Sequence, residues 1–369
     1  MSAHAEQRIR DEGLSQPLLE RVNRLGRQLA EEKGRKLKIM EVCGTHTVAY
    51  ARSGITDLIS ETIELRSGPG CPICVTHQED LDRVFALAGL KDTLIVTFGD
   101  LLRVPGSFTT LEKEKARGSR VQICYSPLEA VETAAKNPEL QVIFIAIGFE
   151  TTTPAAASII LQAEAQGLKN FWVYPVLKRV PPAIAALLQG ENPTGLDGFL
   201  LPGHVSTILG SKAFSLISDA GLPAVVAGFE PLDLLMGLYT LLQLMADNRA
   251  ALGNAYSHVA RENGNPAALK LIDSCFTIEP ATLWRGLGFI PASGYTLKAR
   301  YESFNARLHF DTDVSSAETD PLCICGEVIT GRASPHQCPL FGRRCTPLSP
   351  VGACMVSPEG ACGAYYHYR

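Results

Sequence analysis

Short apolar runs that end in glycine-containing turns alternate along most of the chain with segments of helical periodicity. Each run has the length of one buried strand, and the segments between the runs place apolar residues on one helical face. This alternation is typical of parallel α/β sheets, whose faces are covered by helices. We therefore predict an α/β fold with strands at Lys38–Val42, Leu94–Phe98, Val121–Tyr125, Gln141–Ile147, Phe171–Val176, Gly198–Leu201 and Ala224–Ala227.

The pattern changes outside these runs. Residues 5–33 carry apolar side chains at helical spacing and predict an amphipathic helix or a helical pair. Helices are also expected at Leu232–Asp247 and Arg249–Asn263, followed by a less regular stretch that reaches residue 300. The cysteine-rich segment from residue 301 onward is poor in core-forming residues, so a covalent or metal staple is expected to hold its shape.

One short sequence, Gly-Phe-Glu, occurs twice after an apolar run, at Ile147–Glu150 and at Ala227–Glu230. Each copy is followed by a helical pattern, which suggests two equivalent strand-turn-helix units. We accordingly divide the chain into a helical segment (1–35), an α/β domain (36–125), a second α/β domain (126–230), and a helical region with a cysteine-rich domain (231–369).

Composition and charge exclude several classes of function. The net charge of −4 and the lack of a basic stripe argue against nucleic acid as a partner. The longest apolar stretches, such as Val142–Ile147, are too short to span a membrane. The first residues lack a secretory signal pattern, so we expect a cytoplasmic protein. An activity driven by nucleotide binding or hydrolysis is not expected either, because the first strand is not followed by a glycine-rich phosphate-binding loop.

Six of the eleven cysteines fall within the last forty-seven residues. Clustered thiols in a reducing cytosol are more often metal ligands or redox groups than structural disulfides. Zinc sites usually show CxxC pairs, and the tail has none. The spacing C-x12-C-x6-C-x16-C of Cys325, Cys338, Cys345 and Cys362 suits a cubane iron–sulfur cluster. Zinc binding or inert thiols remain the alternatives.

The first predicted strand ends in Cys43-Gly44-Thr45-His46-Thr47. Ligands of open α/β sheets bind at the carboxyl ends of strands, which makes Cys43 and His46 candidate functional residues. His46 is close enough in sequence to act as a base or to stabilise a thiolate at Cys43. The alternative is that both are buried packing residues.

A second motif, Gly68-Pro69-Gly70-Cys71-Pro72-Ile73-Cys74, precedes a helical pattern. Pro72 suits the first helical position, which places Cys71 at the N-cap and predicts a lowered thiol pKa. Cys71 and Cys74 therefore predict either a reversible disulfide or a two-thiolate site for a soft metal. His77 is more simply a solvated or hydrogen-bonded side chain.

Two further loops at strand ends are polar. Gly148–Pro154 carries three threonines and Glu150, and Pro202–Thr207 carries His204 and two hydroxyl groups. Either loop could line a binding pocket beside a helix N-terminus. Capping and turn formation is the simpler explanation for each loop taken singly.

Taken together, CGTHT, GPGCPIC, GFETTTP, PGHVST and the closing cysteine-rich sequence resemble the HypD family of NiFe-hydrogenase maturation proteins. The motifs extend from residue 38 to the end of the chain. The resemblance implies two similar parallel-sheet α/β domains that face a cleft, plus a smaller iron–sulfur domain. It also implies a scaffold that works with a HypC-type chaperone and a HypE-type cyanide donor to assemble an Fe(CN)2CO unit.

The resemblance assigns roles to individual cysteines. Cys43 would be the thiolate for the assembly iron, with His46 nearby, and Cys71 and Cys74 the essential CxxC pair. Cys325, Cys338, Cys345 and Cys362 would hold a 4Fe-4S cluster. The resemblance assigns no role to Cys124 and Cys354, and we expect these two to relay electrons between the cluster and the CxxC pair as a second dithiol. The alternative function is an iron–sulfur disulfide reductase of the ferredoxin:thioredoxin reductase type.

Overall fold

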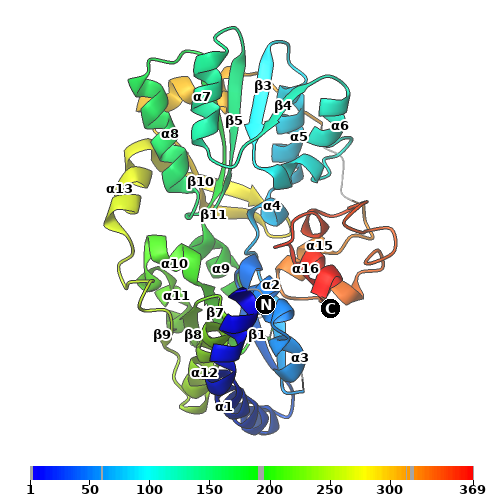
Figure 1. Cartoon of the computed structure of the whole chain (residues 1–369), viewed down its shortest axis with the longest axis vertical. Helices are drawn as coiled ribbons and strands as arrows, with labels where there is room; N and C mark the ends of the chain where they lie inside the picture. Colours follow the sequence, from blue (N-terminus) through cyan, green and yellow to red (C-terminus); the bar gives the residue numbers. More distant parts are fainter. Residues whose placement is uncertain (1–2, 60, 190–194, 313, 316–319, 369) are drawn as a thin grey trace.

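Two β-sheets, one above the other along the long axis of the molecule, form the framework of two lobes (Figure 1). The computed structural model describes residues 3–59, 61–189, 195–312, 314–315 and 320–368, with side chains from residue 15 onward. Most strands in both sheets run parallel. The predicted α/β fold with two parallel-sheet units is therefore confirmed.

The first sheet is wholly parallel and has the strand order β2-β1-β7-β8-β9. Leu37 of β1 pairs with Ile63 of β2, and Ile39 of β1 pairs with Gly198 of β7, so β1 lies between β2 and β7. The strands are β1 (Leu37–Glu41), β2 (Ile63–Ser67), β7 (Gly198–Pro202), β8 (Ala224–Ala227) and β9 (Leu252–Asn254).

The second sheet has the order β10-β11-β6-β5-β3-β4. Four strands are parallel, and an antiparallel hairpin of β10 and β11 extends the β6 edge. The strands are β3 (Thr93–Thr97), β4 (Arg120–Ile123), β5 (Gln141–Gly148), β6 (Phe171–Lys178), β10 (Phe276–Trp284) and β11 (Gly288–Leu297). β5 and β6 are buried over almost their whole length, which explains their continuous apolar runs.

The predicted division of the chain at residue 125 does not match the two sheets. Residues 36–125 supply β1 and β2 to the first sheet but β3 and β4 to the second, and the chain later returns to each sheet in turn. Local alternation predicts a parallel strand but not its partner, because pairing is a long-range property. The two Gly-Phe-Glu units follow β5 and β8, which belong to different sheets.

Sixteen α-helices are found in the described part of the chain. The predicted helix at Arg249–Asn263 is wrong, because the chain leaves α12 at Asn248, which has a positive φ of 50°, and pairs as β9 with β8. The helices of the two lobes are α1 (Ala3–Lys33), α2 (Gly44–Arg52), α3 (Ile55–Ile59), α4 (Pro72–Val75), α5 (Gln78–Ala88), α6 (Leu111–Ala116), α7 (Leu128–Lys136), α8 (Thr153–Ala165), α9 (Val180–Leu188), α10 (Gly203–Leu209), α11 (Ser215–Asp219), α12 (Pro231–Ala246), α13 (Pro266–Cys275) and α14 (Ala306–His309).

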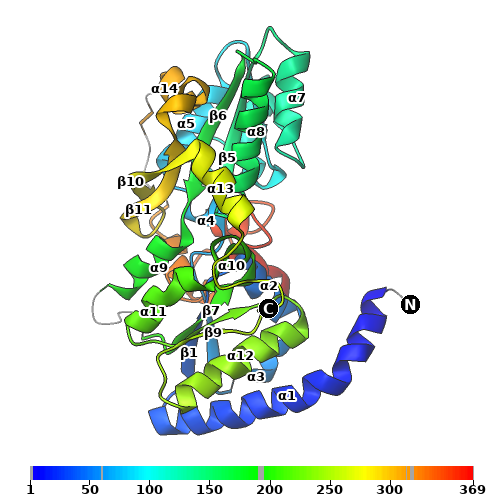
Figure 2. The same ribbon diagram turned by 90° about the vertical axis from the view of Figure 1, so that its left-hand side faces the viewer.

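The long N-terminal helix α1 runs along the end of the lower lobe beside α12, as Figure 2 shows. Val22 and Leu29 are buried in a core shared with Leu238 and Leu241 of α12. The amphipathic helix predicted at residues 5–33 is therefore confirmed, and its apolar stripe covers the first sheet.

The cysteine-rich tail is built mainly of turns and contains two short helices, α15 (Cys325–Ile329) and α16 (Ala361–Tyr368). It lies beside the junction of the two lobes, next to α2 and α4 (Figure 1). Across the residues that the structure describes, no helix combines the length and the apolar character needed to cross a bilayer.

Candidate functional site

The carboxyl ends of the two parallel sheets border a cleft between the lobes. Loops after β1, β2 and β7 line it from the first sheet, and loops after β5 and β6 line it from the second. The cleft encloses about 550 Å³ with its solvent-open part included, and its polar lining comes from Cys43, Thr45, Thr151, Thr152, His204 and Glu359. Each of the four motifs upstream of the tail supplies at least one lining residue.

Cys43 follows β1 and is the N-cap residue of α2. Burial raises the pKa of its thiol to about 11, while the Thr45 hydroxyl and the backbone N–H of His46 act in the opposite direction. Thr45 also donates a hydrogen bond from Oγ1 to Oε1 of Glu359 at 2.8 Å, which joins this loop to the cysteine-rich tail. A cation that binds Cys43 must therefore displace its proton, and hydrogen-bond donors are already in place for the thiolate.

His46 is fully buried beside Cys43 and does not face solvent. Its Nε2 is 2.9 Å from the carbonyl oxygen of Gly228, and burial lowers the pKa of the imidazole to about 4. The ring is therefore neutral at pH 7 and donates from Nε2, which leaves Nδ1 as a buried acceptor without a hydrogen-bond partner.

Phe229 separates two imidazoles at the cleft. Its ring stacks on His46 at 4.7 Å between centroids and on His204 at 3.8 Å. Phe229 belongs to the second Gly-Phe-Glu unit, so that repeat supports the cleft as well as repeating the fold. The sequence pattern identified the repeat but not this contact.

The dithiol motif lies directly against the Cys43 loop. The N–H of Gly44 donates to the Gly70 carbonyl at 3.3 Å, and a Cβ on Gly70 would overlap the Val42 carbonyl oxygen. Glycine is thus required at this position by the close approach of two backbones. The contact brings the loop that carries Cys71 onto the backbone of Cys43.

Cys71 is the N-cap of α4, as predicted, and its Sγ accepts a hydrogen bond from the Cys74 N–H at 3.4 Å. The single helix expected to follow is in fact two, because α4 ends after four residues and His77 caps α5 by accepting from the Glu79 N–H. A helix of one turn has only a small dipole, so α4 exerts little electrostatic effect at its N-terminus. For His77, the capping role confirms the simpler interpretation.

Cys74 is the inner member of the pair. It is 1% exposed, and its Sγ is 4.0 Å from the Ala353 carbonyl oxygen in the tail. Burial raises the pKa of its thiol well above the ordinary value, neighbouring Cys71 and Cys362 raise it further, and Arg285 lowers it. Cys74 therefore lies between the cleft and the cysteine-rich tail.

All six tail cysteines line one small cavity, with apolar Val328, Phe341 and Met355 completing its wall. The pKa of the Cys362 thiol is raised by burial first and then by the neighbouring charges of Cys345, Cys323 and Cys338. These four thiols are thus close enough to repel one another when ionised. A positively charged metal centre would relieve that repulsion.

The other two cysteines of the cavity, Cys325 and Cys354, form a disulfide. A disulfide sulfur carries no thiolate, so Cys325 is not available as a ligand in this state, and Cys323 occupies the place by the other three thiols. The expected pairing of Cys354 with Cys124 is wrong. Cys124 lies after β4 in the core of the second sheet, among Ala130, Val131 and other apolar residues.

Glu150 is a buried carboxyl behind the cleft wall. Both of its oxygens accept from the Val180 N–H, at 3.0 and 3.3 Å, which caps α9. Burial raises the pKa of this carboxyl to about 7. The Gly148–Pro154 loop therefore combines capping, by Glu150, with cleft lining, by Thr151 and Thr152.

No group of three or more His, Cys, Asp or Glu side chains is spaced to hold one metal ion in the portion of the chain that the structure describes. A single zinc ion needs four ligands at about 2.0–2.3 Å from one point. A cubane differs, since each thiolate binds its own iron atom. Four thiols around one cavity, two of them buried and two partly exposed, fit that arrangement better than a single-ion site.

Comparisons with known proteins agree with the motifs. The family model described as "HypD: Hydrogenase formation hypA family" matches residues 18–369. The chain is 42% identical to the Hydrogenase maturation factor HypD of Escherichia coli (strain K12), across 95% of this chain and 94% of that protein. It is 43% identical to the Hydrogenase maturation factor HypD of Rhodobacter capsulatus, across 98% and 97%. The Hydrogenase expression/formation protein HupD of Azotobacter chroococcum mcd 1 is 40% identical, across 91% and 90%.

Proposed function

This chain belongs to the HypD family, and we propose that it is a hydrogenase maturation scaffold on which an iron atom receives its cyanide and carbon monoxide ligands. The observation that carries the proposal is the convergence of four loops on one cleft, with the cysteine cavity next to Cys74. One loop carries Cys43, the second carries the Cys71–Cys74 motif and lines the cleft through Gly70 and Pro72, and the other two are the polar loops Gly148–Pro154 and Pro202–Thr207. A scaffold needs a site that holds cargo and stays open to partners, and a cleft between two lobes supplies it.

Cys43 is the proposed ligand of the substrate iron. A thiolate is a soft ligand that suits iron carrying cyanide and carbon monoxide. Thr45 and the start of α2 supply hydrogen-bond donors for the thiolate. Neutral His46 anchors the loop through its hydrogen bond to the Gly228 carbonyl. A HypC-type chaperone is proposed to bind the iron from the open side of the cleft, and a HypE-type protein to deliver the cyanide.

The proposed resident cofactor is a 4Fe-4S cluster in the cysteine cavity. The mutual repulsion of Cys323, Cys338, Cys345 and Cys362 supports these four as its ligands, with Cys323 in place of Cys325. The cluster would supply single electrons to the neighbouring thiols. Cys74 lies on the cavity side of the CxxC pair, which makes Cys71 and Cys74 the proposed redox pair between cavity and cleft.

Replacing Cys43 tests the scaffold directly. The Cys43→Ala variant, purified anaerobically with a HypC-type partner, should lose the infrared bands of metal-bound cyanide and carbon monoxide. Its cluster iron should remain at the wild-type level, because Cys43 does not line the cysteine cavity. Cys124→Ala, which removes a thiol remote from the cavity, is the matched control and should keep the bands.

Two results would contradict the proposal. Bands that persist in the Cys43→Ala complex would return Cys43 to a packing role. Disulfide-reductase turnover by a wild-type complex that has no such bands would instead favour a ferredoxin:thioredoxin reductase type of function.

A further inference from the structure

A tight turn at residues 357–360 lies between the cysteine cavity and the cleft. Cys354 before the turn and Cys362 after it line the cavity, whereas Glu359 within it lines the cleft. A Cβ on Gly360 would overlap the Cys354 carbonyl oxygen, so only glycine lets the two backbones come this close. The backbone of the 357–360 turn is therefore fixed against the cavity side, and the Glu359 side chain reaches the cleft from there.

The 357–360 turn contacts the lobe of the first sheet beside Cys43. Thr45 donates from Oγ1 to Oε1 of Glu359 at 2.8 Å, and Thr45 is two residues from Cys43. Gly44 packs so closely on the turn that a Cβ on it would overlap the Glu359 carbonyl oxygen. The Glu359 carboxylate thus lies at the Cys43 loop, and both residues line the same cleft.

The same turn contacts the lobe of the second sheet through one buried hydroxyl. Ser357, which is 3% exposed, donates from Oγ to Oδ2 of Asp100 at 2.9 Å. Asp100 belongs to the short 3-10 helix η1 (Gly99–Arg103), which follows β3. The Ser357 Oγ also accepts from the Glu359 N–H at 3.3 Å. A hydroxyl has one hydrogen, and because Asp100 accepts it, the lone pairs of Ser357 remain for Glu359.

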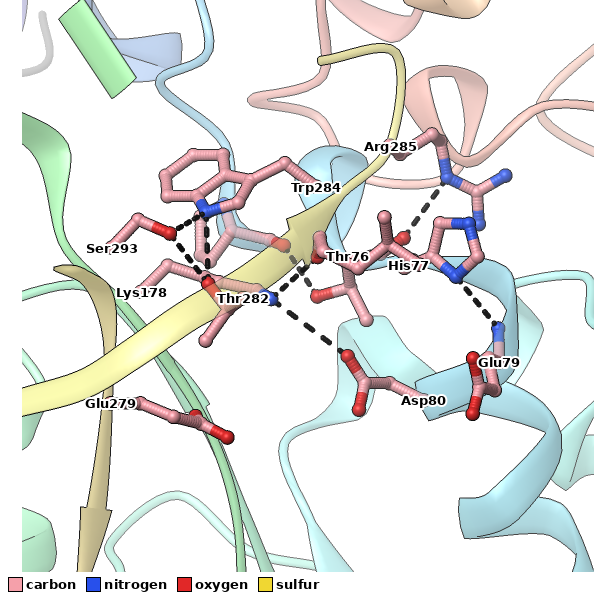
Figure 3. Close-up of polar contacts among 12 residues, drawn as sticks. Thr76, His77, Glu79, Asp80, Lys178, Glu279, Thr282, Trp284, Arg285 and Ser293 are labelled. Carbon is pink, nitrogen blue, oxygen red and sulfur yellow. Dashed lines mark hydrogen bonds and ion pairs between the residues drawn. The ribbon is translucent and has the colours of Figure 1, made fainter. Parts of the chain in front are cut away.

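A second connection between the lobes, through the chain that follows the CxxC motif, does not depend on the 357–360 turn. The β10–β11 hairpin holds this chain, since Nε of Arg285 donates to the Thr76 carbonyl at 3.0 Å (Figure 3). Buried Lys178, at the end of β6, lies 3.8 Å from Asp80 of α5 (Figure 3). The lobes therefore stay joined when the turn is altered, and losing the Ser357 contact should move Glu359 without separating them.

We propose that Asp100 and Ser357 are positioning residues that hold the Glu359 carboxylate beside Cys43, so that this end of the cleft favours cationic over anionic ligands. The inference rests on the proposed function for the role of Cys43 as the ligand of the substrate iron. A fixed negative charge attracts ferrous iron and repels anions at short range. A mobile side chain extends into solvent, where its charge is screened, so its position decides how selective the cleft is.

Alkylation of Cys43 by a neutral and an anionic reagent measures this selectivity. The full-length protein, purified anaerobically without a partner, is treated with iodoacetamide or iodoacetate at one pH. The rates are followed in the tryptic peptide 39–52, whose only cysteine is Cys43. Both reagents attack the same thiolate, so the ratio of the two rates cancels any change in the thiol pKa. Glu359→Gln, which removes the charge, should lower the iodoacetamide-to-iodoacetate ratio by about threefold.

The variants of the two positioning residues separate their effect from a change of charge. Ser357→Ala changes no charge, yet it should lower the ratio by about twofold, because Glu359 is no longer held at the Cys43 loop. Added to Glu359→Gln, it should cause no further decrease, since Ser357 acts through Glu359. Asp100→Ala should match Ser357→Ala, whereas Asp100→Asn keeps an acceptor for the Ser357 hydroxyl and should stay closer to wild type.

Ser107→Ala is the matched control. Ser107 donates from Oγ to Oδ2 of Asp82 at 2.6 Å in the lobe of the second sheet, and neither is among the described residues that line the cleft. The variant loses the same kind of hydrogen bond away from Cys43, so its ratio should equal that of wild type. Melting temperature and iron content are measured on every variant.

An unchanged ratio in Ser357→Ala would overturn the proposal, even if both rates rise together, because the turn would then control only access to the cleft. An equal further decrease on the Glu359→Gln background would overturn it as well. If Ser357→Ala does not fold, the Asp100 variants decide: a wild-type ratio in Asp100→Ala, or equal decreases in Asp100→Ala and Asp100→Asn, count against it. The scaffold role fails separately, through persistence of the infrared bands in Cys43→Ala.

Discussion

The cleft and the cysteine cavity both contain buried thiols, yet their surroundings differ in almost every other respect. Among the described residues that line the cleft, Cys43 is the only cysteine, and hydroxyls, an imidazole and a carboxylate share the lining. In the cavity, the lining is sulfur and apolar carbon, from six cysteines with valine, phenylalanine, methionine and glycine. The neighbours of a thiol, more than the thiol itself, decide which chemistry it can take part in.

The electrostatics of the two sites make the same distinction. Burial raises the pKa of Cys43 and of Cys362 alike. At Cys43, donors from Thr45 and His46 oppose the effect and the Glu359 charge adds less to it, whereas at Cys362 three further thiols all add to it. A single thiolate with hydrogen-bond donors around it suits a substrate that binds and is later released. Several mutually repelling thiolates, flanked by apolar side chains, suit a cofactor that stays bound.

The largest expected effect comes from replacing, one at a time, the two cysteines of the CxC sequence in the tail. Cys323→Ala should lose the colour and about four irons of a cubane, whereas Cys325→Ala should keep most of both, because Cys325 is joined to Cys354. Iron and acid-labile sulfide analysis of anaerobic protein measures the difference. Cys338→Ala provides the reference for complete loss.

The opposite pattern would restore the ligand set expected from the sequence. In that case Cys325→Ala would be colourless and Cys323→Ala would keep its iron. Loss in both variants would indicate that the disulfide between Cys325 and Cys354 is itself required to shape the cavity.

The fold was largely predictable because buried parallel strands have a clear local signature. All seven predicted strands are present to within about two residues, and β5 and β6 stand out through their long apolar runs. β2 and the β10–β11 hairpin were missed, since their polar residues interrupt the apolar pattern, and the short β9 was predicted as part of a helix. The assignment of strands to sheets was missed for a different reason, as pairing depends on contacts distant in sequence.

The candidate site was predictable in its residues but not in its connections. Cys43, Cys71 and His204 follow strands, so their position at one sheet edge could be inferred. Glu359 reaches the cleft from the far end of the chain, and no spacing rule indicates this. The partner of Cys325 was likewise hidden, because six clustered cysteines allow many pairings.

Glu150 supplies the next prediction, which concerns the cleft wall and has no counterpart in the cavity. Its pKa rises from 4.5 to about 7 in the folded protein, so the folded state holds the proton more tightly than the unfolded state. The resulting stability is fully present below pH 4.5 and is lost as the pH rises toward 7, by about 3 kcal/mol.

Glu150→Gln should remove this loss, because an amide keeps an acceptor for the Val180 N–H without a charge. The urea midpoint of the first unfolding transition, measured on both proteins at pH values below and above this range, gives the comparison. The wild-type midpoint should fall with pH and the variant midpoint should not. Parallel decreases in both proteins would show that another group titrates.

The smallest expected effect concerns the hydrogen bond that joins the two regions. Thr45 donates to Glu359 at 2.8 Å near the surface, which links the Cys43 loop to the segment that closes the cavity. In a double-mutant cycle, Thr45→Val and Glu359→Gln should show a coupling free energy of about 0.5–1 kcal/mol in urea unfolding, because solvent screens an exposed pair. A larger coupling would mean that the cleft and the cavity fold as one cooperative unit, and additive effects would mean that the tail is held to the cleft by its backbone packing alone.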